Sequence, residues 1–305
     1  MNHHHSHIIG TDVDRAVGVL TSGGLVGLPT ETVYGLAARS DVAEAVRRVF
    51  TVKGRPPGHP LIVHVGSIET ARNLAAEWNV VADSLARAFW PGPLTLVVPR
   101  SPSVLDEVTG GLNTVAIRVP AHPLALELLR RVPYGVVAPS ANLFGRVSPT
   151  SAAHVSADLG DAVDYVLDGG QCRIGLESTI VDCSQSTPQI LRPGAITEAE
   201  ITALIGRIGP TSGPSRAPGM LASHYAPQTS ITIVDDEEQA AARNPTGAPV
   251  FDARPDPETF AHDLYELLRR CDDEGHSEII VILPSDQGIG TAIRDRLTKA
   301  AAPRS

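Results

Sequence analysis

The stretch LVGLPTETVYGL, residues 25–36, places a polar loop directly after a short apolar run. An apolar run of this length, bounded by glycine and proline, predicts a strand at 25–28. After the loop PTETVYG, apolar residues recur with helical spacing from Ala43 onward. An earlier helix is predicted to begin after Asp12, whose carboxylate can accept hydrogen bonds from the first free N–H groups. Strands and helices that alternate in this way predict an α/β fold.

The same alternation continues to about residue 205, although several strands follow one another without a helix between them. We therefore expect a twisted, mixed sheet rather than a purely parallel one. Further strands are predicted at 61–65, 94–98, 114–119, 135–138, 165–167, 179–181 and 189–191. Further helices are predicted at 68–75, 80–89, 123–131, 151–159 and 197–205.

The composition changes at Gly209, where a segment rich in proline, glycine and serine begins and the apolar period stops. Such a segment predicts a linker, yet it carries Met220, His224 and Tyr225, which a passive spacer does not need. Strands are predicted beyond it at 231–234, 249–251 and 278–283, and helices over 260–271 and 289–301. The predicted regions are a large domain at 1–208, a linker or lid at 209–230 and a small βα domain at 231–305.

Charge and composition argue against several classes of protein. The net charge of −9 opposes general binding to nucleic acid, because that binding needs Lys and Arg to neutralise phosphates. The three cysteines, Cys172, Cys183 and Cys271, include no CxxC pair, which argues against a disulfide framework or a zinc site. The N-terminal MNHHHSHIIG lacks a signal-peptide pattern, and no apolar run approaches the ~20 residues of a membrane span. We expect a cytoplasmic protein with no metal held by its own side chains.

Polar and cationic residues stand at the ends of the predicted strands, where ligand clefts of α/β proteins usually form. Cations gathered there on an acidic protein indicate an anionic ligand, such as a carboxylate or a phosphate. Each residue alone is more often a solvated charge or a turn former, so only their shared position favours a cleft. They are Thr30, Glu31, Thr32, Tyr34, Lys53, Arg55, His59, His64, Arg118, Ser140, Asn142, Ser148, Ser178, Thr179 and Arg192.

The order of the motifs points to a known family. They are GLPTETVYGL, VKGRPPGHPLIVHV, FWPGPLTLV, NTVAIRVPAHPLA, APSANLFGRVSPT, LDGG, LESTIVD and LRPG. In order and spacing they resemble the YrdC-like domain of the threonylcarbamoyl-AMP synthases. PGMLASHYAP at 218–227, followed by a small βα domain, resembles the two-domain, long form of that family. The resemblance implies a twisted, mixed sheet of the YrdC-like type with a large cleft, and a smaller Rossmann-like second domain.

The resemblance implies an L-threonylcarbamoyladenylate synthase, a nucleotidyltransferase that combines L-threonine, bicarbonate or CO₂, and ATP and releases pyrophosphate. The family's product passes to a separate complex that modifies tRNA. Mg²⁺ is expected to bind through the ATP phosphates. The sequence contains no GxSxG elbow, HExxH or phosphate-loop motif, which agrees with chemistry based on positioning and charge neutralisation.

Matched position by position, the resemblance also assigns roles to residues. It implies that L-threonine contacts Thr32, His64, Arg118, Ser178 and the backbone near Ala138. It implies that the nucleotide contacts Arg55, His59, Thr114, Ser140, Asn142, Ser148, Arg192 and Tyr225. Lys53 and Arg55 are the expected catalytic residues, because they would supply positive charge beside the phosphates.

Two other functions remain open for such a chain. A YrdC-like protein could bind double-stranded RNA on its concave surface, which the net charge of −9 disfavours. It could instead transfer a carbamoyl group, although such domains usually lie in larger chains with zinc-finger cysteines. The segment Pro218–Pro227 is predicted to be a lid, because Met220, His224 and Tyr225 gain by covering a ligand that water would hydrolyse.

Overall fold

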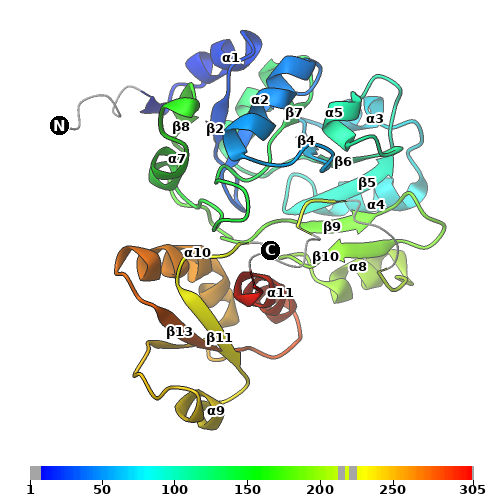
Figure 1. Cartoon of the computed structure of the whole chain (residues 1–305). Helices are drawn as coiled ribbons and strands as arrows, with labels where there is room; N and C mark the ends of the chain where they lie inside the picture. The colour runs from blue at the N-terminus through cyan, green and yellow to red at the C-terminus, as the bar shows by residue number, and fades with distance from the viewer. Residues whose placement is uncertain (1–7, 212–216, 220–224, 304–305) are drawn as a thin grey trace.

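The computed structural model describes residues 8–211, 217–219 and 225–303. It contains a large sheet of ten strands and a separate sheet of three strands, with helices packed on both (Figure 1). The prediction of an α/β protein with a large mixed sheet and a smaller second domain is confirmed.

The elements of the larger part follow in chain order. They are β1 (Ile9–Gly10), α1 (Val13–Thr21), β2 (Val26–Leu28), β3 (Gly35–Arg39), α2 (Ala43–Lys53), β4 (Ile62–His64), α3 (Ile68–Asn73), α4 (Val80–Phe89), β5 (Leu94–Pro99), α5 (Asp106–Thr109), β6 (Thr114–Arg118), α6 (Pro123–Arg131), β7 (Val136–Val137), α7 (Ala152–Leu159), the short 3-10 helix η2 (Gly160–Ala162), β8 (Tyr165–Leu167), β9 (Thr179–Asp182), β10 (Gln189–Arg192) and α8 (Glu198–Ile205). The smaller part contains β11 (Ser230–Val234), α9 (Glu237–Ala242), β12 (Val250–Asp252), α10 (Pro257–Asp273), β13 (Glu278–Ile282) and α11 (Ile289–Ala301).

The large sheet has the strand order β1-β8-β2-β3-β7-β4-β6-β5-β9-β10. Its pairings are mixed, since β4 runs parallel to β6 whereas β2 and β3, and also β5 and β6, are antiparallel. The central strands β4 and β6 come from separate parts of the chain and pair with His64 opposite Arg118. The topology therefore brings two predicted site residues together in the middle of the sheet.

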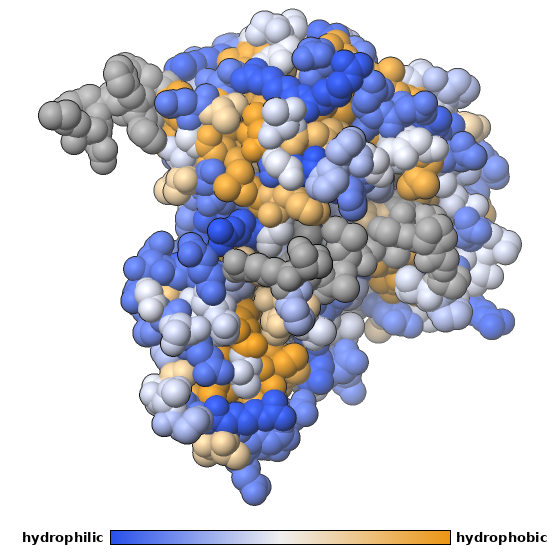
Figure 2. All heavy atoms as spheres, in the orientation of Figure 1, coloured by the Kyte–Doolittle hydropathy of each residue, from blue (hydrophilic) through white to orange (hydrophobic). Residues whose placement is uncertain are grey.

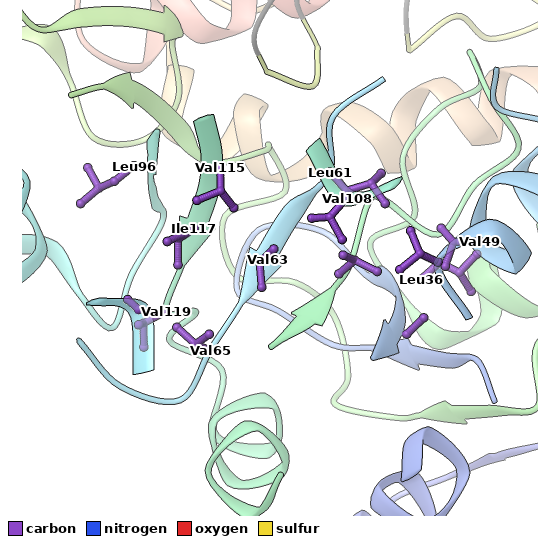
Figure 3. Close-up of a cluster of buried hydrophobic side chains, with 14 of the residues drawn as sticks. Leu36, Val49, Leu61, Val63, Val65, Leu96, Val108, Val115, Ile117 and Val119 are labelled. Carbon is purple, nitrogen blue, oxygen red and sulfur yellow. The ribbon is translucent and has the colours of Figure 1, made fainter. Parts of the chain in front are cut away.

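The two faces of the large sheet are covered differently. The main hydrophobic core lies between one face and helices α2, α3, α4 and α7, and Figure 3 shows Val63, Val115 and Ile117 facing it from the central strands. Helices α1 and α6 cover the opposite face over β2, β3, β7 and β8. Over β4, β6 and β10 that opposite face instead carries a small cluster that includes the buried Ala217.

The smaller sheet is entirely parallel, with β13 between β11 and β12, as expected of a Rossmann-like unit. Its helices α10 and α11 lie on the side next to the larger part (Figure 1). Leu264 and Ile293 from these helices share one hydrophobic cluster with Val33, Leu176 and Tyr225. The C-terminal domain is therefore packed directly against the loops that follow the strands of the large sheet.

The predicted strands and helices are present with bounds within two residues of the predicted ones, except that α10 begins three residues earlier, at Pro257. Asp12 caps α1 as expected, because its carboxylate accepts from the Arg15 N–H at 3.0 Å. The helix predicted from Ala43 is present as α2, but β3, which lies between the PTETVYG loop and α2, was not predicted. Its sequence GLAAR has no β-branched residue, and Gly35 permits close approach: a Cβ there would lie 2.8 Å from the Ala138 Cβ. The short elements β1, α5 and α9 were also not predicted.

The three cysteines are buried and free. Hydrophilic side chains cover much of the face shown in Figure 2. In the described part of the chain, no helix is both long and apolar enough to cross a lipid bilayer.

Candidate active site

A cavity of about 50 Å³ lies on the face of the large sheet that α1 and α6 leave uncovered. Its wall is built from strand ends and the loops that follow them, as expected for an α/β protein. All the residues predicted to contact L-threonine line it, namely Thr32, His64, Arg118, Ala138 and Ser178. Four of the predicted nucleotide contacts also line it, namely Arg55, Ser140, Arg192 and Tyr225.

Strand register explains why His64 and Arg118 point into the cavity. Side chains alternate between the faces of a sheet, so His64 shares a face with Ile62, and Arg118 shares one with Ala116. Ile62 and Ala116 both belong to the small cluster on the cavity side. The two polar side chains therefore leave the main core and meet at the ends of β4 and β6.

Arg118 is buried and held by three partners. Its Nε donates to the Gly92 carbonyl at 3.2 Å, and its Nη1 donates to the Thr32 hydroxyl at 2.8 Å. Its Nη2 lies 2.7 Å from the Glu31 carboxylate, and the carboxylate also accepts from the Ala121 N–H at 3.0 Å. Each terminal nitrogen of a guanidinium carries a second N–H, so Arg118 keeps two parallel donors for a carboxylate ligand.

His64 is a neutral imidazole inside the cavity wall. Burial, together with the nearby Arg118 charge, lowers the pKa of His64 to about 3. Its Nδ1 has no hydrogen-bond partner among the described residues. A buried polar atom without a partner is costly, so this nitrogen indicates a contact made by a ligand.

Arg192, at the end of β10, holds the part of the cavity wall next to β9. Its Nε donates to the Ser178 carbonyl at 3.0 Å, and its Nη2 donates to the Ser178 hydroxyl at 3.1 Å. The same hydroxyl lies 2.8 Å from that of Thr95 on β5, and Arg192 Nη1 donates to the Pro218 carbonyl at 3.3 Å. Arg192 thus binds both Ser178, a predicted threonine contact, and Pro218, in the segment that follows the large domain.

Arg55 lies on the cavity wall with part of its hydrogen-bonding capacity unused. Its Nη2 donates to the Pro60 carbonyl at 3.2 Å, while its Nε has no partner among the described residues. Burial lowers the pKa of Arg55 to about 10, which still leaves it charged at neutral pH. The His59 ring lies 5.9 Å from the Phe144 ring, and Arg55 lies 5.8 Å from that same ring. His59 is therefore near Arg55, outside the cavity lining.

Lys53 does not line the cavity but supports its wall. Its ammonium group donates to the carbonyls of Ser140 and Asn142, the latter at 2.5 Å. Burial, followed by the charge of Arg55, lowers the pKa of Lys53 to about 7. In this structure Lys53 orders the APSAN loop beside the cavity.

Three other predicted nucleotide contacts are also absent from the cavity lining. Thr114 begins β6, at the opposite end of the strand from Arg118. The Asn142 amide donates to two carbonyls of its own loop, at 2.7 and 2.9 Å. The Ser148 hydroxyl donates to Glu177 at 2.7 Å. Their contacts with a nucleotide, and that of His59, remain predictions.

Two family models match the chain in succession. "Telomere recombination" matches residues 18–194, and "Threonylcarbamoyl-AMP synthase, C-terminal domain" matches residues 196–302. The threonylcarbamoyl-AMP synthase of Pyrococcus abyssi is 39% identical, over 95% of this chain and 94% of that protein. The chain belongs to the threonylcarbamoyl-AMP synthase family.

Other threonylcarbamoyl-AMP synthases agree in sequence and in structure. The Bacillus subtilis protein is 39% identical, over 96% of this chain and 93% of that protein. The crystal structure of Pyrococcus abyssi Sua5 complexed with L-threonine matches with a TM-score of 0.89 at 39% identity. That match covers 95% of this chain and 94% of the solved chain, so both domains are included.

Two acidic residues of this threonylcarbamoyl-AMP synthase site were given no role from the sequence, since Glu31 was named only as a candidate cleft residue and Glu177 was not named. Glu31 pairs with Arg118, and Glu177 lines the cavity beside Ser178. Both are almost fully buried. The only signal in the sequence is that each acid lies inside a motif, PTETVYG or LESTIVD, whose neighbours are predicted site residues.

A threonylcarbamoyl-AMP synthase that uses ATP is expected to require Mg²⁺. In the described ranges no three His, Cys, Asp or Glu side chains converge to hold a metal ion.

Proposed function

We infer that this chain is a threonylcarbamoyl-AMP synthase, an enzyme that forms an adenylate. The observation that carries the inference is the convergence of Arg118, His64 and Ser178 with Arg55 and Arg192 in one cavity of a family member. The first three residues are proposed to hold L-threonine, and the other two arginines are proposed to hold ATP. Amino-acid carboxylate and nucleotide phosphates are the anions that such cations bind well.

The proposed substrates are L-threonine, ATP, and bicarbonate or CO₂. The threonine amine adds to the carbon of CO₂ and loses a proton, which gives an N-carboxylate. An oxygen of that carboxylate attacks the α-phosphorus of ATP, the bond to the β-phosphate breaks, and pyrophosphate leaves. Both reactants are anions, so the site must align them and neutralise their charge.

The residues of the cavity are suited to this task. Arg118 is fixed by Glu31 and Thr32 and can receive the threonine carboxylate with both terminal nitrogens. His64 can exchange a hydrogen bond with the substrate without adding charge, because it is neutral. The unused Nε of Arg55 is free to meet a phosphate oxygen. Lys53 adds positive charge once an anion raises its pKa again.

Mg²⁺ bound through the ATP phosphates is proposed to add further neutralisation of charge. Ser140 and Asn142, on the loop that Lys53 orders, and Ser148 beyond it are proposed to contact the nucleotide in that region. The product is proposed to pass to a separate complex that transfers the threonylcarbamoyl group to tRNA. The acidic chain itself is not expected to bind nucleic acid strongly.

Release of pyrophosphate provides the direct test. We expect release only when L-threonine, bicarbonate, ATP and Mg²⁺ are all present, because the attacking N-carboxylate forms only from L-threonine and bicarbonate or CO₂. Each component is omitted in turn, and L-serine replaces L-threonine in a further sample. Equal release without threonine would identify an ATPase and contradict the proposal. Threonine-independent retardation of RNA in a gel would instead favour the RNA-binding alternative.

A second prediction concerns the segment Pro218–Pro227, which we propose acts as a lid. Pro218, Gly219 and Tyr225 line the cavity, whereas Met220 and His224 lie outside the described residues. The cavity of about 50 Å³ is smaller than the roughly 300 Å³ or more of usual ligand sites, so we propose that this wall moves to admit ATP.

Limited proteolysis between Gly213 and Ala226 tests the lid. We expect cleavage there to slow when ATP and L-threonine are added together, since closure over both ligands removes the segment from the protease. Cleavage is followed by mass spectrometry, with ATP alone and L-threonine alone as controls. An unchanged rate with both ligands, together with full activity of Tyr225→Phe, would contradict this role.

A further inference from the structure

A buried arginine of the C-terminal domain reaches the wall of the cavity. Arg296 on α11 is 0% exposed, and its Nε donates to the Glu177 carboxylate at 2.7 Å. Its Nη2 donates to the Pro193 carbonyl at 3.0 Å, next to Arg192. Glu177 itself lines the cavity. The C-terminal domain therefore contributes a charge directly behind the proposed ATP site.

Glu177 is the centre of a buried network that joins the two domains. One of its oxygens accepts from the Ser148 hydroxyl at 2.7 Å, and the other accepts from the Tyr265 hydroxyl at 2.8 Å. The Tyr265 ring stacks on Tyr225 at 5.9 Å, and Arg296 lies 5.2 Å from the Tyr225 ring. Two proposed nucleotide contacts, Ser148 and Tyr225, thus depend on this carboxylate or its partners.

The charge of Glu177 needs compensation at this position. A carboxylate in the wall of a site for a triphosphate repels its ligand unless a cation cancels its field. Burial alone would raise the pKa of Glu177, but Arg296 and then Arg192 outweigh it and lower the pKa to about 2. The carboxylate is therefore ionised. The charged or titratable groups around it are Arg192, Tyr225, Tyr265 and Arg296. Arg296 also pairs with Asp295 at 2.5 Å, and Asp295 in turn pairs with Lys299 at 2.7 Å.

We propose that Arg296 is a positioning residue of the ATP site. Its positive charge cancels the negative charge of Glu177, so that the Glu177 carboxylate can order Ser148 and the cavity wall without repelling the ATP phosphates. The proposal rests on the proposed function, because it takes ATP as the ligand of the cavity. It gives the C-terminal domain an electrostatic role in the reaction, through a contact made inside the protein.

Calorimetric titration of the full chain with MgATP tests the proposal. Arg296→Met should weaken ATP binding by about tenfold or more, the scale of one charge-assisted contact. Arg296→Met/Glu177→Gln should recover most of the affinity, because the uncompensated charge is removed. Glu177→Gln alone keeps an acceptor oxygen for Ser148 and leaves a cation behind the phosphates, so its loss of ATP affinity should be smaller than that of Arg296→Met.

The pH dependence gives a readout that a merely structural role would not move. Without Arg296 the pKa of Glu177 should rise, because its nearest cation is lost. The carboxylate is charged above its pKa and neutral below it, so the defect should shrink as the pH falls from about 8 to 5. The ratio of mutant to wild-type affinity is compared at each pH, which removes the effect of protonating ATP itself.

Arg294→Met is the matched control, since Arg294 lies on the same helix and pairs with Asp235 and the Pro284 carbonyl, away from the cavity. Its affinity for ATP should equal that of the wild type. If Arg296→Met fails to fold, the ATP affinities of Arg296→Met/Glu177→Gln and of Glu177→Gln still test the proposal. A loss of about tenfold or more in both would indicate a packing role and overturn the proposal, as would unchanged binding in a folded Arg296→Met. If the wild type binds no ATP, the proposed function is wrong and the inference falls with it.

Discussion

Replacing Glu31 with glutamine should lower the free energy of unfolding by about 3–5 kcal/mol, the usual cost of breaking a buried ion pair. The side chains of Glu31 and Arg118 are each only 4% exposed, and they lie 2.7 Å apart. A glutamine has one acceptor oxygen where Glu31 uses two, so its NH₂ group would face either Arg118 or the Ala121 N–H, and Arg118 would stay charged and uncompensated. Thermal unfolding followed by calorimetry measures the change.

A surface pair provides the matched control for Glu31→Gln. Glu127 pairs with Arg131 on α6 at 3.2 Å, with side chains that are 53% and 38% exposed. Glu127→Gln should cost less than about 1 kcal/mol, because exposed pairs contribute little. The double change Glu31→Gln/Arg118→Met should cost less than the sum of its single changes, since it removes both buried charges. Equal costs for Glu31→Gln and Glu127→Gln would show that the buried pair is unimportant.

Much of the fold could be predicted because strands and helices leave local patterns. The helix at Val80–Phe89 and the strand at Tyr165–Leu167 have the predicted bounds, since apolar period and flanking turn residues both mark them. β3 could not be found in this way. GLAAR is apolar without β-branched residues, and it becomes a strand because β2 and β7 lie on either side to pair with it.

Local sequence patterns likewise reveal some residues of the candidate site and not others. Arg118 and His64 could be proposed from motifs at strand ends, and the register of β4 and β6 then places them side by side. The contacts of Glu177 with Tyr265 and Arg296 could not be proposed from the sequence. Both partners lie far from Glu177 in the sequence, and the apolar spacing around them predicts only that they belong to helices. Lys53 shows a further limit, since its sequence context does not reveal that it binds two backbone carbonyls.

Replacing Arg118 with alanine should weaken L-threonine binding roughly 10- to 150-fold, which corresponds to a charge-assisted hydrogen bond of about 1.5–3 kcal/mol. The reason is geometric, since Glu31, Thr32 and Gly92 hold the guanidinium while each terminal nitrogen keeps one donor for the ligand. ATP affinity should change much less, because Arg55 and Arg192 are the proposed nucleotide contacts. Calorimetry with each ligand separately measures both constants.

The alanine variant also leaves Glu31 buried without its partner, so Arg118→Lys is the variant that separates binding from folding. Lysine keeps a positive charge near Glu31 but lacks the planar pair of donors that a carboxylate ligand requires. We expect Arg118→Lys to unfold near the wild-type temperature and still to bind L-threonine at least about tenfold more weakly. If either variant weakened ATP and L-threonine to the same extent, Arg118 would not be the residue that recognises the amino acid.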